Sequence, residues 1–260
     1  MKKATVIIIS ALLVIGLLAV GGCGKKTAEQ TPEKEKVLRV ITEAGFAPFE
    51  FKTKNDEFTG FDMDLIRAIG AAEGYKVEIT HMGFESLIPA LNAGKADCII
   101  AGYSMDPERK KAVDFSKPYF DAGLIIAVPS ASEGISKLDN LKGKRIGCQV
   151  ATIGANAADS VKAKDPNTKV VYYDTVGEAF MEMDKGGLDA VINDQAVTAY
   201  YIMTAGKGKI KMVGEMFSAQ DQYGIAVKKG NAEFLKVIND GLDKIRANGE
   251  YDKIYDKWFK

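Results

Sequence analysis

The chain has 260 residues, of which 47% are hydrophobic and 27% charged, and its 35 Lys plus Arg balance 35 Asp plus Glu. This composition is typical of a soluble globular protein with room for one large or two medium domains. It excludes the basic field that nucleic acid requires. A single histidine, His81, without zinc-spaced Cys/His motifs gives no basis for a metal site. We expect no nucleic-acid partner, no metal and no cofactor.

Residues 1–22 are predicted to be a signal peptide, because two lysines precede an apolar run that is short for a membrane span. The run ends in Val20-Gly-Gly-Cys23, which resembles a bacterial lipobox, where the cysteine is lipidated and becomes the N-terminus. We therefore expect an anchor at Cys23 on the extracytoplasmic face of the cell membrane. Cleavage at small residues beside an incidental cysteine is the competing interpretation. Residues 23–36 are polar and are expected to form a flexible tether.

From Val37 onward, strand and helix patterns alternate, which predicts an α/β fold with sheets of the parallel type. Asp62 is expected to cap the first helix, Pro89 to lie in the first turn of the second, and Thr175 to form a capping box with Glu178. Strands are expected at 37–41, 75–80, 98–101, 122–128, 145–149, 169–173, 190–193, 210–213 and 224–227, and helices at 62–74, 84–94, from 151, 175–186, 194–203, 234–245 and 251–259.

An internal echo suggests two similar lobes. A helix, a Gly, an Asp and an apolar strand follow one another in register around Asp97 and again around Asp189, 92 residues later. This spacing is too long for a solenoid repeat. Cys98 and Cys148 lie in apolar runs and are interpreted as buried free thiols. The aromatic stripe of the last helix is interpreted as core packing.

The stretch Ala101–Arg109 is the strongest candidate site. It follows a buried strand; Gly102 lets the backbone approach a ligand, and Asp106-Pro107 starts a helical turn that aims Arg109 back at the strand end. Carbonyls and the Ser104 hydroxyl can accept from an ammonium, while the guanidinium matches a carboxylate. A solvated run of charges is the alternative interpretation of Glu108–Lys111.

Several motifs in order resemble the polar amino-acid binding proteins of bacterial ABC importers, solute-binding family 3. They are Glu43-Ala-Gly-Phe-Ala-Pro-Phe-Glu-Phe51, Gly60-Phe-Asp-Met-Asp64, Leu87-Ile-Pro-Ala-Leu91, Asp106-Pro-Glu-Arg-Lys-Lys111, Asp114-Phe-Ser116 and Trp258-Phe259. The resemblance implies a type II periplasmic-binding-protein fold, with two α/β lobes joined by a two-strand hinge and a ligand cleft between them. Lobe 1 is then residues 37–120 and 224–260, and lobe 2 is residues 121–223.

The resemblance also implies a role for individual residues. Arg109 matches the partner of the ligand α-carboxylate, assisted by backbone N–H groups near Ser104, Thr152 and Ile153, and Asp194 matches the acid for the α-ammonium, opposite Ser104 and the Ala101–Gly102 backbone. Phe46 and Phe84 match an aromatic pair around the side-chain stem, and Glu43 and Gln149 match specificity positions. Without the family context, Phe46 and Phe84 could equally be core residues, Glu43 a loop acid and Asp194 only a helix cap.

The chain departs from glutamine binders of this family, which tend to have Asp, Lys and His where it has Glu43, Gln149 and Asn193. A fixed cation is thereby lost while an acid remains, so a cationic ligand is better matched. We expect a monomeric binding protein that takes arginine or lysine before glutamine and delivers it to an ABC permease and ATPase complex. The loss of a hydroxyl at Ile153 weakens only the side-chain part of the carboxylate site.

Two alternatives remain open. A cyclohexadienyl-dehydratase-like enzyme on the same fold would need a spare general acid, for which only Glu43 and Glu85 are candidates. A sensor module would act through a partner and would still begin with amino-acid binding.

Overall fold

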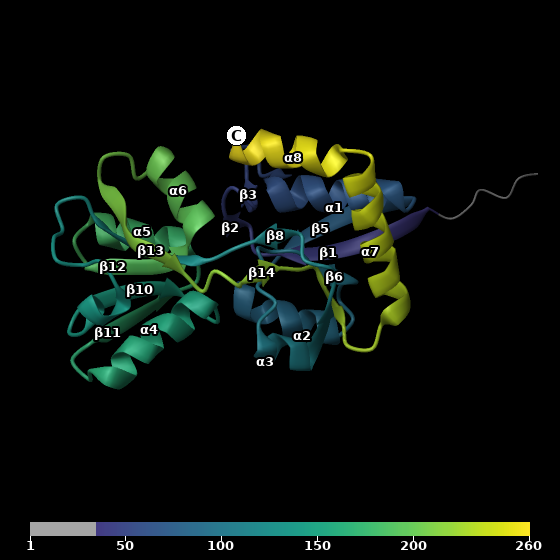
Figure 1. Ribbon diagram of the computed structural model, residues 1–260. Helices are drawn as coiled ribbons and strands as arrows, with labels where there is room; N and C mark the ends of the chain where they lie inside the picture. Colours follow the sequence, from purple (N-terminus) through teal and green to yellow (C-terminus); the bar gives the residue numbers. More distant parts are fainter. Residues whose placement is uncertain (1–34) are drawn as a thin grey trace, which may run out of the picture. The chain divides into compact units, whose positions relative to one another are not determined.

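The structure, a computed structural model, describes residues 35–260, in which strands alternate with helices (Figure 1). The expectations for the signal peptide, for Cys23 and for the tether up to residue 34 lie outside the described residues. The strands are β1 (Lys36–Thr42), β2 (Gly45–Phe46), β3 (Glu50–Lys52), β4 (Phe58–Thr59), β5 (Tyr75–His81), β6 (Cys98–Ile99), β7 (Val113–Phe115), β8 (Phe120–Asp121), β9 (Leu124–Pro129), β10 (Arg145–Gln149), β11 (Lys169–Tyr173), β12 (Ala190–Asp194), β13 (Ile210–Phe217), β14 (Gln222–Tyr223) and β15 (Ala226–Lys228). The helices are α1 (Phe61–Ala72), α2 (Leu87–Asn92), α3 (Pro107–Ala112), α4 (Ile153–Lys164), α5 (Val176–Asp184), α6 (Gln195–Met203), α7 (Ala232–Ala247) and α8 (Glu250–Phe259), with 3₁₀ turns at Phe84–Ser86 and Leu138–Leu141.

Most of these strands form two five-stranded sheets. The first sheet has the order β5-β1-β6-β15-β7 and the second the order β11-β10-β12-β9-β13. Three neighbouring strands of each sheet run parallel, but β15 pairs antiparallel with β6 and β7, and β9 pairs antiparallel with β12 and β13. The expectation of parallel sheets is therefore wrong for these pairs. The reason is that β9 and β15 are each preceded by another strand, and not by the helix that a parallel crossover requires.

Helix starts largely follow the sequence signals. Pro89 lies in the first turn of α2, the Asp106 carboxylate caps α3, and Thr175 makes the predicted capping box with Glu178. Asp62 is the exception, because Gly60 is the N-terminal cap of α1. The Asp62 carboxylate instead accepts hydrogen bonds from parts of the chain remote in sequence, so it is not available to the helix terminus.

The core uses both faces of each sheet. In β1, Leu38 and Val40 contact the cluster that includes α1 and α7, whereas Ile41 contacts the α2 cluster, as the two-residue period of a strand requires. In the second sheet, Ile146 packs with α4 and Val191 with α5. Figure 1 shows α4 and α5 on opposite sides of that sheet. Each such aliphatic side chain contributes roughly 1.5–3 kcal/mol by burial.

The internal echo corresponds to a repeated ion pair. Asp97 accepts from the Arg39 backbone N–H at 2.8 Å and from the Arg39 guanidinium Nη2 at 2.6 Å. Asp189 accepts from the backbone N–H and Nη2 of Arg145, both at 2.8 Å. In each sheet the carboxylate that precedes one inner strand, β6 or β12, therefore ties that strand to its neighbour.

Two short strands connect the sheets. In sequence, β8 lies between β7 of the first sheet and β9 of the second, and β14 lies between β13 of the second sheet and β15 of the first. They pair antiparallel, with Phe120 opposite Tyr223. The ring of Phe259, from α8, lies 5.1 Å from that of Phe120 and 5.4 Å from that of Phe49. The interpretation of the C-terminal aromatic stripe as core packing is confirmed.

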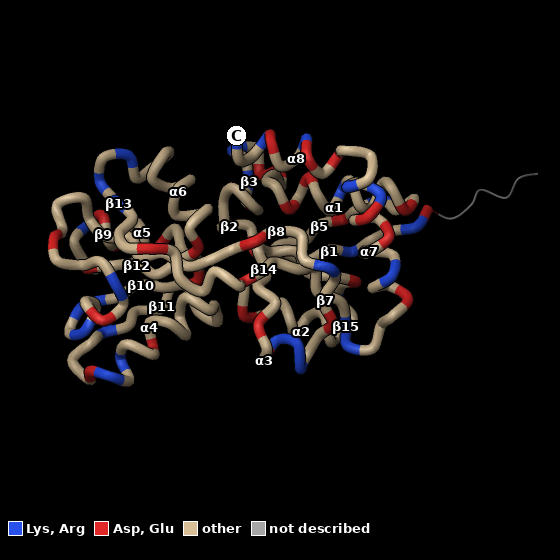
Figure 2. The backbone as a smooth tube through the Cα atoms, in the orientation of Figure 1, with Lys and Arg blue, Asp and Glu red and all other residues tan. Residues whose placement is uncertain are grey.

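Charged residues of both signs alternate along the described chain (Figure 2). Both Cys98 and Cys148 are buried free thiols, as expected. Among residues 35–260 there is no helix with the length and apolar character that crossing a bilayer demands.

The Arg145–Asp189 pair gives a first prediction. Replacing Asp189 by Ala should lower the free energy of unfolding by about 1–2 kcal/mol, because a partly buried carboxylate that accepts from both backbone and guanidinium is lost. Asp189→Asn, which keeps one acceptor oxygen, should cost less. Urea unfolding of both variants measures this, with the exposed Asp256→Ala as control. Equal stability of Asp189→Ala and wild type would contradict the assignment.

Candidate functional site

One pocket between the two sheets brings together all eleven residues that the sequence singled out. Its lining consists of Glu43, Phe46, Glu50, Phe84, Ala101, Gly102, Ser104, Arg109, Gln149, Thr152, Ile153 and Asp194. Glu50 is the one member that the sequence reasoning did not select. The enclosed cavity measures about 10 Å³, which is room for about one water molecule. An amino acid enters only if the walls move apart.

Arg109 joins the two sides of this pocket. It lies on α3, and its guanidinium donates to the Ser104 carbonyl oxygen at 3.1 Å and to the Ala151 carbonyl oxygen at 2.9 Å. The guanidinium carbon is 4.2 Å from the centre of the Tyr103 ring and 5.1 Å from that of Phe84. Two aromatic rings and a carbonyl on its own side thus fix the orientation of the cation.

The segment after β6 approaches the aromatic loop closely. Gly102 has a φ of 51°, and a Cβ there would lie 2.8 Å from the Phe46 ring. Both the backbone conformation and the lack of space therefore require glycine. Nearby, the Ser104 hydroxyl donates to the Asp221 carboxylate at 2.7 Å. Asp221 precedes β14, and nothing in the sequence marked it.

Glu43 and Gln149 face each other across the pocket. The Gln149 side-chain amide donates to Glu43 Oε2 at 3.2 Å and to the Asp174 carbonyl oxygen at 2.9 Å. Glu43 is 2% exposed. Burial raises the pKa of Glu43 to about 7, although the hydrogen bond from Gln149 opposes the shift. An exposed loop acid is therefore excluded as an interpretation of Glu43.

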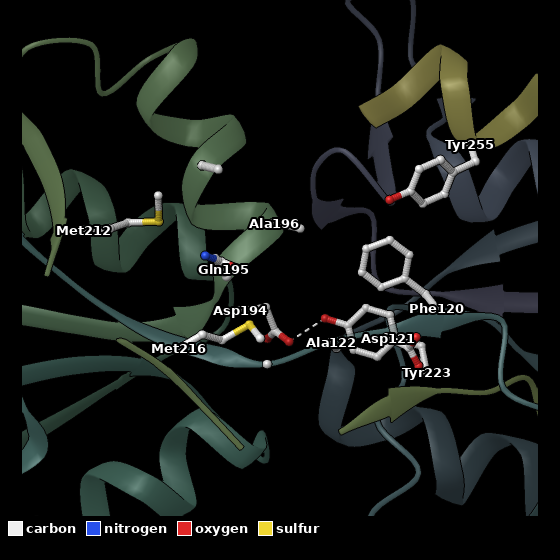
Figure 3. A pocket seen from close by; sticks show the side chains of 12 residues that line it. Phe120, Asp121, Ala122, Asp194, Gln195, Ala196, Met212, Met216, Tyr223 and Tyr255 are labelled. Atoms are coloured by element: carbon white, nitrogen blue, oxygen red, sulfur yellow. Dashed lines mark hydrogen bonds between the residues drawn. The ribbon is translucent and has the colours of Figure 1, made fainter. Parts of the chain in front are cut away.

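Asp194 is held by a connecting strand. It is the N-terminal cap residue of α6, but its side chain makes no capping hydrogen bond. Instead Asp194 Oδ1 accepts from the Tyr223 hydroxyl at 2.5 Å (Figure 3). Burial raises the pKa of Asp194 to about 7, and the Tyr223 hydroxyl opposes the shift. The interpretation of Asp194 as only a helix cap is wrong for its side chain.

Asp194 also borders a second and larger cavity of about 320 Å³, which is drawn in Figure 3. Both connecting strands line it, through Phe120 and Tyr223, together with Met212 and Met216 of β13. None of Arg109, Glu43 and Gln149 reaches this cavity. The smaller pocket, where the guanidinium meets the acids, is therefore the candidate site.

Glu50 is fully buried and has neither of its carboxyl oxygens hydrogen-bonded to a donor among residues 35–260. Its neighbour Asp62 accepts from the Gly102 backbone N–H at 2.8 Å and from the Tyr119 hydroxyl at 2.7 Å, both through Oδ2. The sequence signal that could have identified Glu50 is its position between Phe49 and Phe51, as the only acid in the aromatic motif Phe46–Phe51.

Two other candidates have clear positions. Thr152 caps α4, with its hydroxyl accepting from the Ala155 N–H at 3.1 Å. Glu85, an acid considered for the enzyme alternative, is exposed and does not line the pocket. Within residues 35–260 no cluster of three or more His, Cys, Asp or Glu side chains is arranged to hold a metal ion.

Comparison with known proteins decides the family. The family model described as bacterial extracellular solute-binding proteins, family 3, matches residues 38–260. The chain belongs to this family. The resemblance inferred from the sequence motifs is thereby confirmed, and the family is one of binding proteins, not of enzymes.

Individual relatives and solved structures agree with this family assignment. A probable histidine-binding protein of Neisseria gonorrhoeae is 37% identical over 245 residues, which cover 94% of this chain and 91% of that protein. The structure of an ancestral arginine-binding protein bound to arginine superposes with a TM-score of 0.83 at 46% identity. The match covers 88% of this chain and 100% of that protein. The arginine-, lysine-, histidine-binding protein ArtJ of Geobacillus stearothermophilus gives a TM-score of 0.79 at 36% identity, covering 86% and 95%.

The fold of this family-3 protein is accordingly the type II periplasmic-binding-protein fold, as expected from the motifs. In this arrangement the two sheets with their helices are the two lobes, and β8 and β14 connect them.

The raised pKa values of Glu43 and Asp194 predict how stability depends on pH. The folded protein retains protons that the unfolded chain releases between about pH 4 and pH 7, so the free energy of unfolding should fall as the pH rises through this window. Glu43→Gln should reduce that fall by on the order of 3 kcal/mol. Urea unfolding at pH 4.5 and pH 7.5 tests this, with the exposed Glu85→Gln as the matched control. Identical pH dependence of Glu43→Gln and wild type would refute the role of burial at Glu43.

Proposed function

We propose that this protein binds a polar L-amino acid, arginine or lysine before glutamine, and delivers it to the permease and ATPase complex of an ABC importer. The observation that carries the proposal is the charge of the pocket wall, in which three carboxyl groups, those of Glu43, Glu50 and Asp194, accompany one guanidinium, that of Arg109. A ligand with one carboxylate and two cationic groups complements this set. Relatives whose names include arginine, lysine and histidine support a cationic ligand.

The proposed contacts follow from the geometry. The ligand α-carboxylate pairs with Arg109, which now donates to two carbonyl oxygens and can exchange one of them for a charged partner. Backbone N–H groups at Ser104, Thr152 and Ile153 complete that end. The α-ammonium lies between Asp194 on one side and Ser104 with the Ala101–Gly102 backbone on the other.

At the far end, the side-chain cation of the ligand meets Glu43. Its stem lies between the rings of Phe46 and Phe84, which are 6% and 8% exposed. Gln149 already contacts Glu43 as a neutral donor. With a neutral glutamine ligand, Glu43 would stay protonated or carry an uncompensated charge, whereas an ammonium or guanidinium would stabilise its ionised form.

Binding requires a motion, because a cavity of about 10 Å³ does not hold an amino acid. We propose that the lobes, residues 37–120 with 224–260 and residues 121–223, separate about β8 and β14 and close on the ligand. Such hinge closure is common among periplasmic binding proteins. The closed form would be the one that the transporter recognises.

Ligand-induced stabilisation tests the proposal. Purified protein, unfolded and refolded to remove carried-over ligand, is heated in the presence of each common amino acid. A ligand at 100 times its Kd should add about 2.7 kcal/mol to the free energy of unfolding, and arginine or lysine should give the largest rise in Tm. Arg109→Ala should abolish the rise, because the α-carboxylate loses its partner.

The exposed Lys110→Ala, next to Arg109 on α3, is the matched control and should respond as wild type does. A rise with glutamine alone would leave amino-acid binding intact and overturn the cationic ligand. No rise with any amino acid, in protein that unfolds cooperatively, would overturn the function.

The membrane anchor is a separate part of the proposal, supported by the lipobox that ends in Cys23. Cells fed radiolabelled palmitate should label the wild-type protein, and Cys23→Ser should abolish the label and release the protein from the membrane fraction. Unchanged membrane association of Cys23→Ser would refute the anchor.

A further inference from the structure

Two buried carboxyl groups lie together at the wall of the pocket without enough donors. Three oxygens of this pair, Glu50 Oε1, Glu50 Oε2 and Asp62 Oδ1, have no hydrogen-bond partner among residues 35–260. The Asp62 backbone N–H donates to the Phe49 carbonyl oxygen at 2.9 Å, which holds the two acids close together, and each shifts the pKa of the other. Both residues are 0% exposed, so bulk solvent does not reach these oxygens. Two ionised carboxylates in contact and out of water would be strongly unfavourable.

A single proton between the groups resolves most of this conflict. It would satisfy one Glu50 oxygen and Asp62 Oδ1, while Asp62 Oδ2 keeps the Gly102 N–H and the Tyr119 hydroxyl. The second oxygen of Glu50 then remains as an acceptor. Because Glu50 lines the pocket and Asp62 does not, this acceptor belongs to the site.

We infer that Glu50 and Asp62 share one proton and that Glu50 is a specificity-determining residue, which presents the remaining single negative charge of the pair to a cationic ligand. The inference rests on the proposed function. It adds to Glu43 and Asp194 a third acid at the site, supplied by β3 together with the first turn of α1.

The direction of the pKa shifts of Glu50 and Asp62 agrees with one shared proton. Burial, with the neighbouring acids Asp62, Glu43 and Asp194, raises the pKa of Glu50 well above its usual range. Burial raises the pKa of Asp62 only to about 6, because the Gly102 N–H and the Tyr119 hydroxyl stabilise its charge. At neutral pH the pair therefore keeps one proton and carries one negative charge.

Amide substitutions test the inference, because an amide N–H can replace the shared proton. Glu50→Gln can donate to Asp62, and Asp62→Asn can donate to Glu50, so either single variant keeps one negative charge on the pair. The double variant Glu50→Gln/Asp62→Asn has none. Arginine and its neutral isostere citrulline are the probes, and the ratio of their Kd values, measured by titration calorimetry, is the readout.

We expect arginine to bind at least about tenfold more tightly than citrulline in wild type, each single variant to keep the ratio within about threefold, and the double variant to lose about tenfold. The control is Asp56→Asn/Glu57→Gln, which removes two exposed acids from the β3–β4 turn and should leave the ratio unchanged. A tenfold loss in each single variant would mean that both acids are ionised, and an unchanged ratio in the double variant would mean that the pair carries no charge. Either result overturns the inference.

A second measurement needs no ligand. Infrared spectra of the unligated protein at about pH 9, where Glu43 and Asp194 with pKa values of about 7 are ionised, should contain the band of a buried, protonated carboxylic acid, and each single variant should lack it. Absence of this band in wild type, or its survival in both variants, overturns the shared proton. If arginine fails to bind to wild type, the proposed function fails while the infrared result still decides the proton. If the double variant does not fold, the infrared comparison of the single variants decides the inference.

Discussion

Four carboxyl groups, those of Glu43, Glu50, Asp62 and Asp194, are buried close together and out of contact with bulk solvent. Three of them find donors among their protein neighbours, and Glu50 has none among residues 35–260. Most of the contacts that define the site follow from this constraint. The Gln149 amide, the Gly102 N–H and the hydroxyls of Tyr119 and Tyr223 supply these donors from different elements. The acids therefore organise the pocket before any ligand enters, and they are the basis of the proposed preference for a cationic ligand.

The two sheets around this pocket contain the same strand-anchoring ion pair. Arg39 with Asp97 and Arg145 with Asp189 perform the same task in the two sheets, and neither pair lines the pocket. Each lobe then needs only short connections to present its strand ends to the other. The connecting strand β14 contains Tyr223 and directly follows Asp221, so an element of the proposed hinge also holds two polar groups that contact the site.

Much of the fold followed from local signals, since capping residues, Gly–Asp strand starts and helical periodicity depend on neighbours in sequence. The family motifs supplied the eleven site residues, which the structure brings into one pocket. The misses involve partners remote in sequence. Asp62 looks like a cap from its neighbours, yet its partners are 40 and 57 residues away. The antiparallel strands follow from connections between lobes, and the burial of Glu50 depends on aromatic residues from several elements, neither of which a local pattern contains.

The hydrogen bond from Tyr223 to Asp194 has a kinetic consequence. In the proposed complex the phenol hydroxyl and the ligand ammonium bind the same carboxylate, so the hydroxyl remains as a donor when the ammonium leaves. Asp194 is then never left bare in a medium of low polarity at any point of the cycle. A donor that remains on the carboxylate in this way lowers the free-energy barrier to ligand release. Fast release matters for a binding protein that must pass its ligand to a membrane transporter.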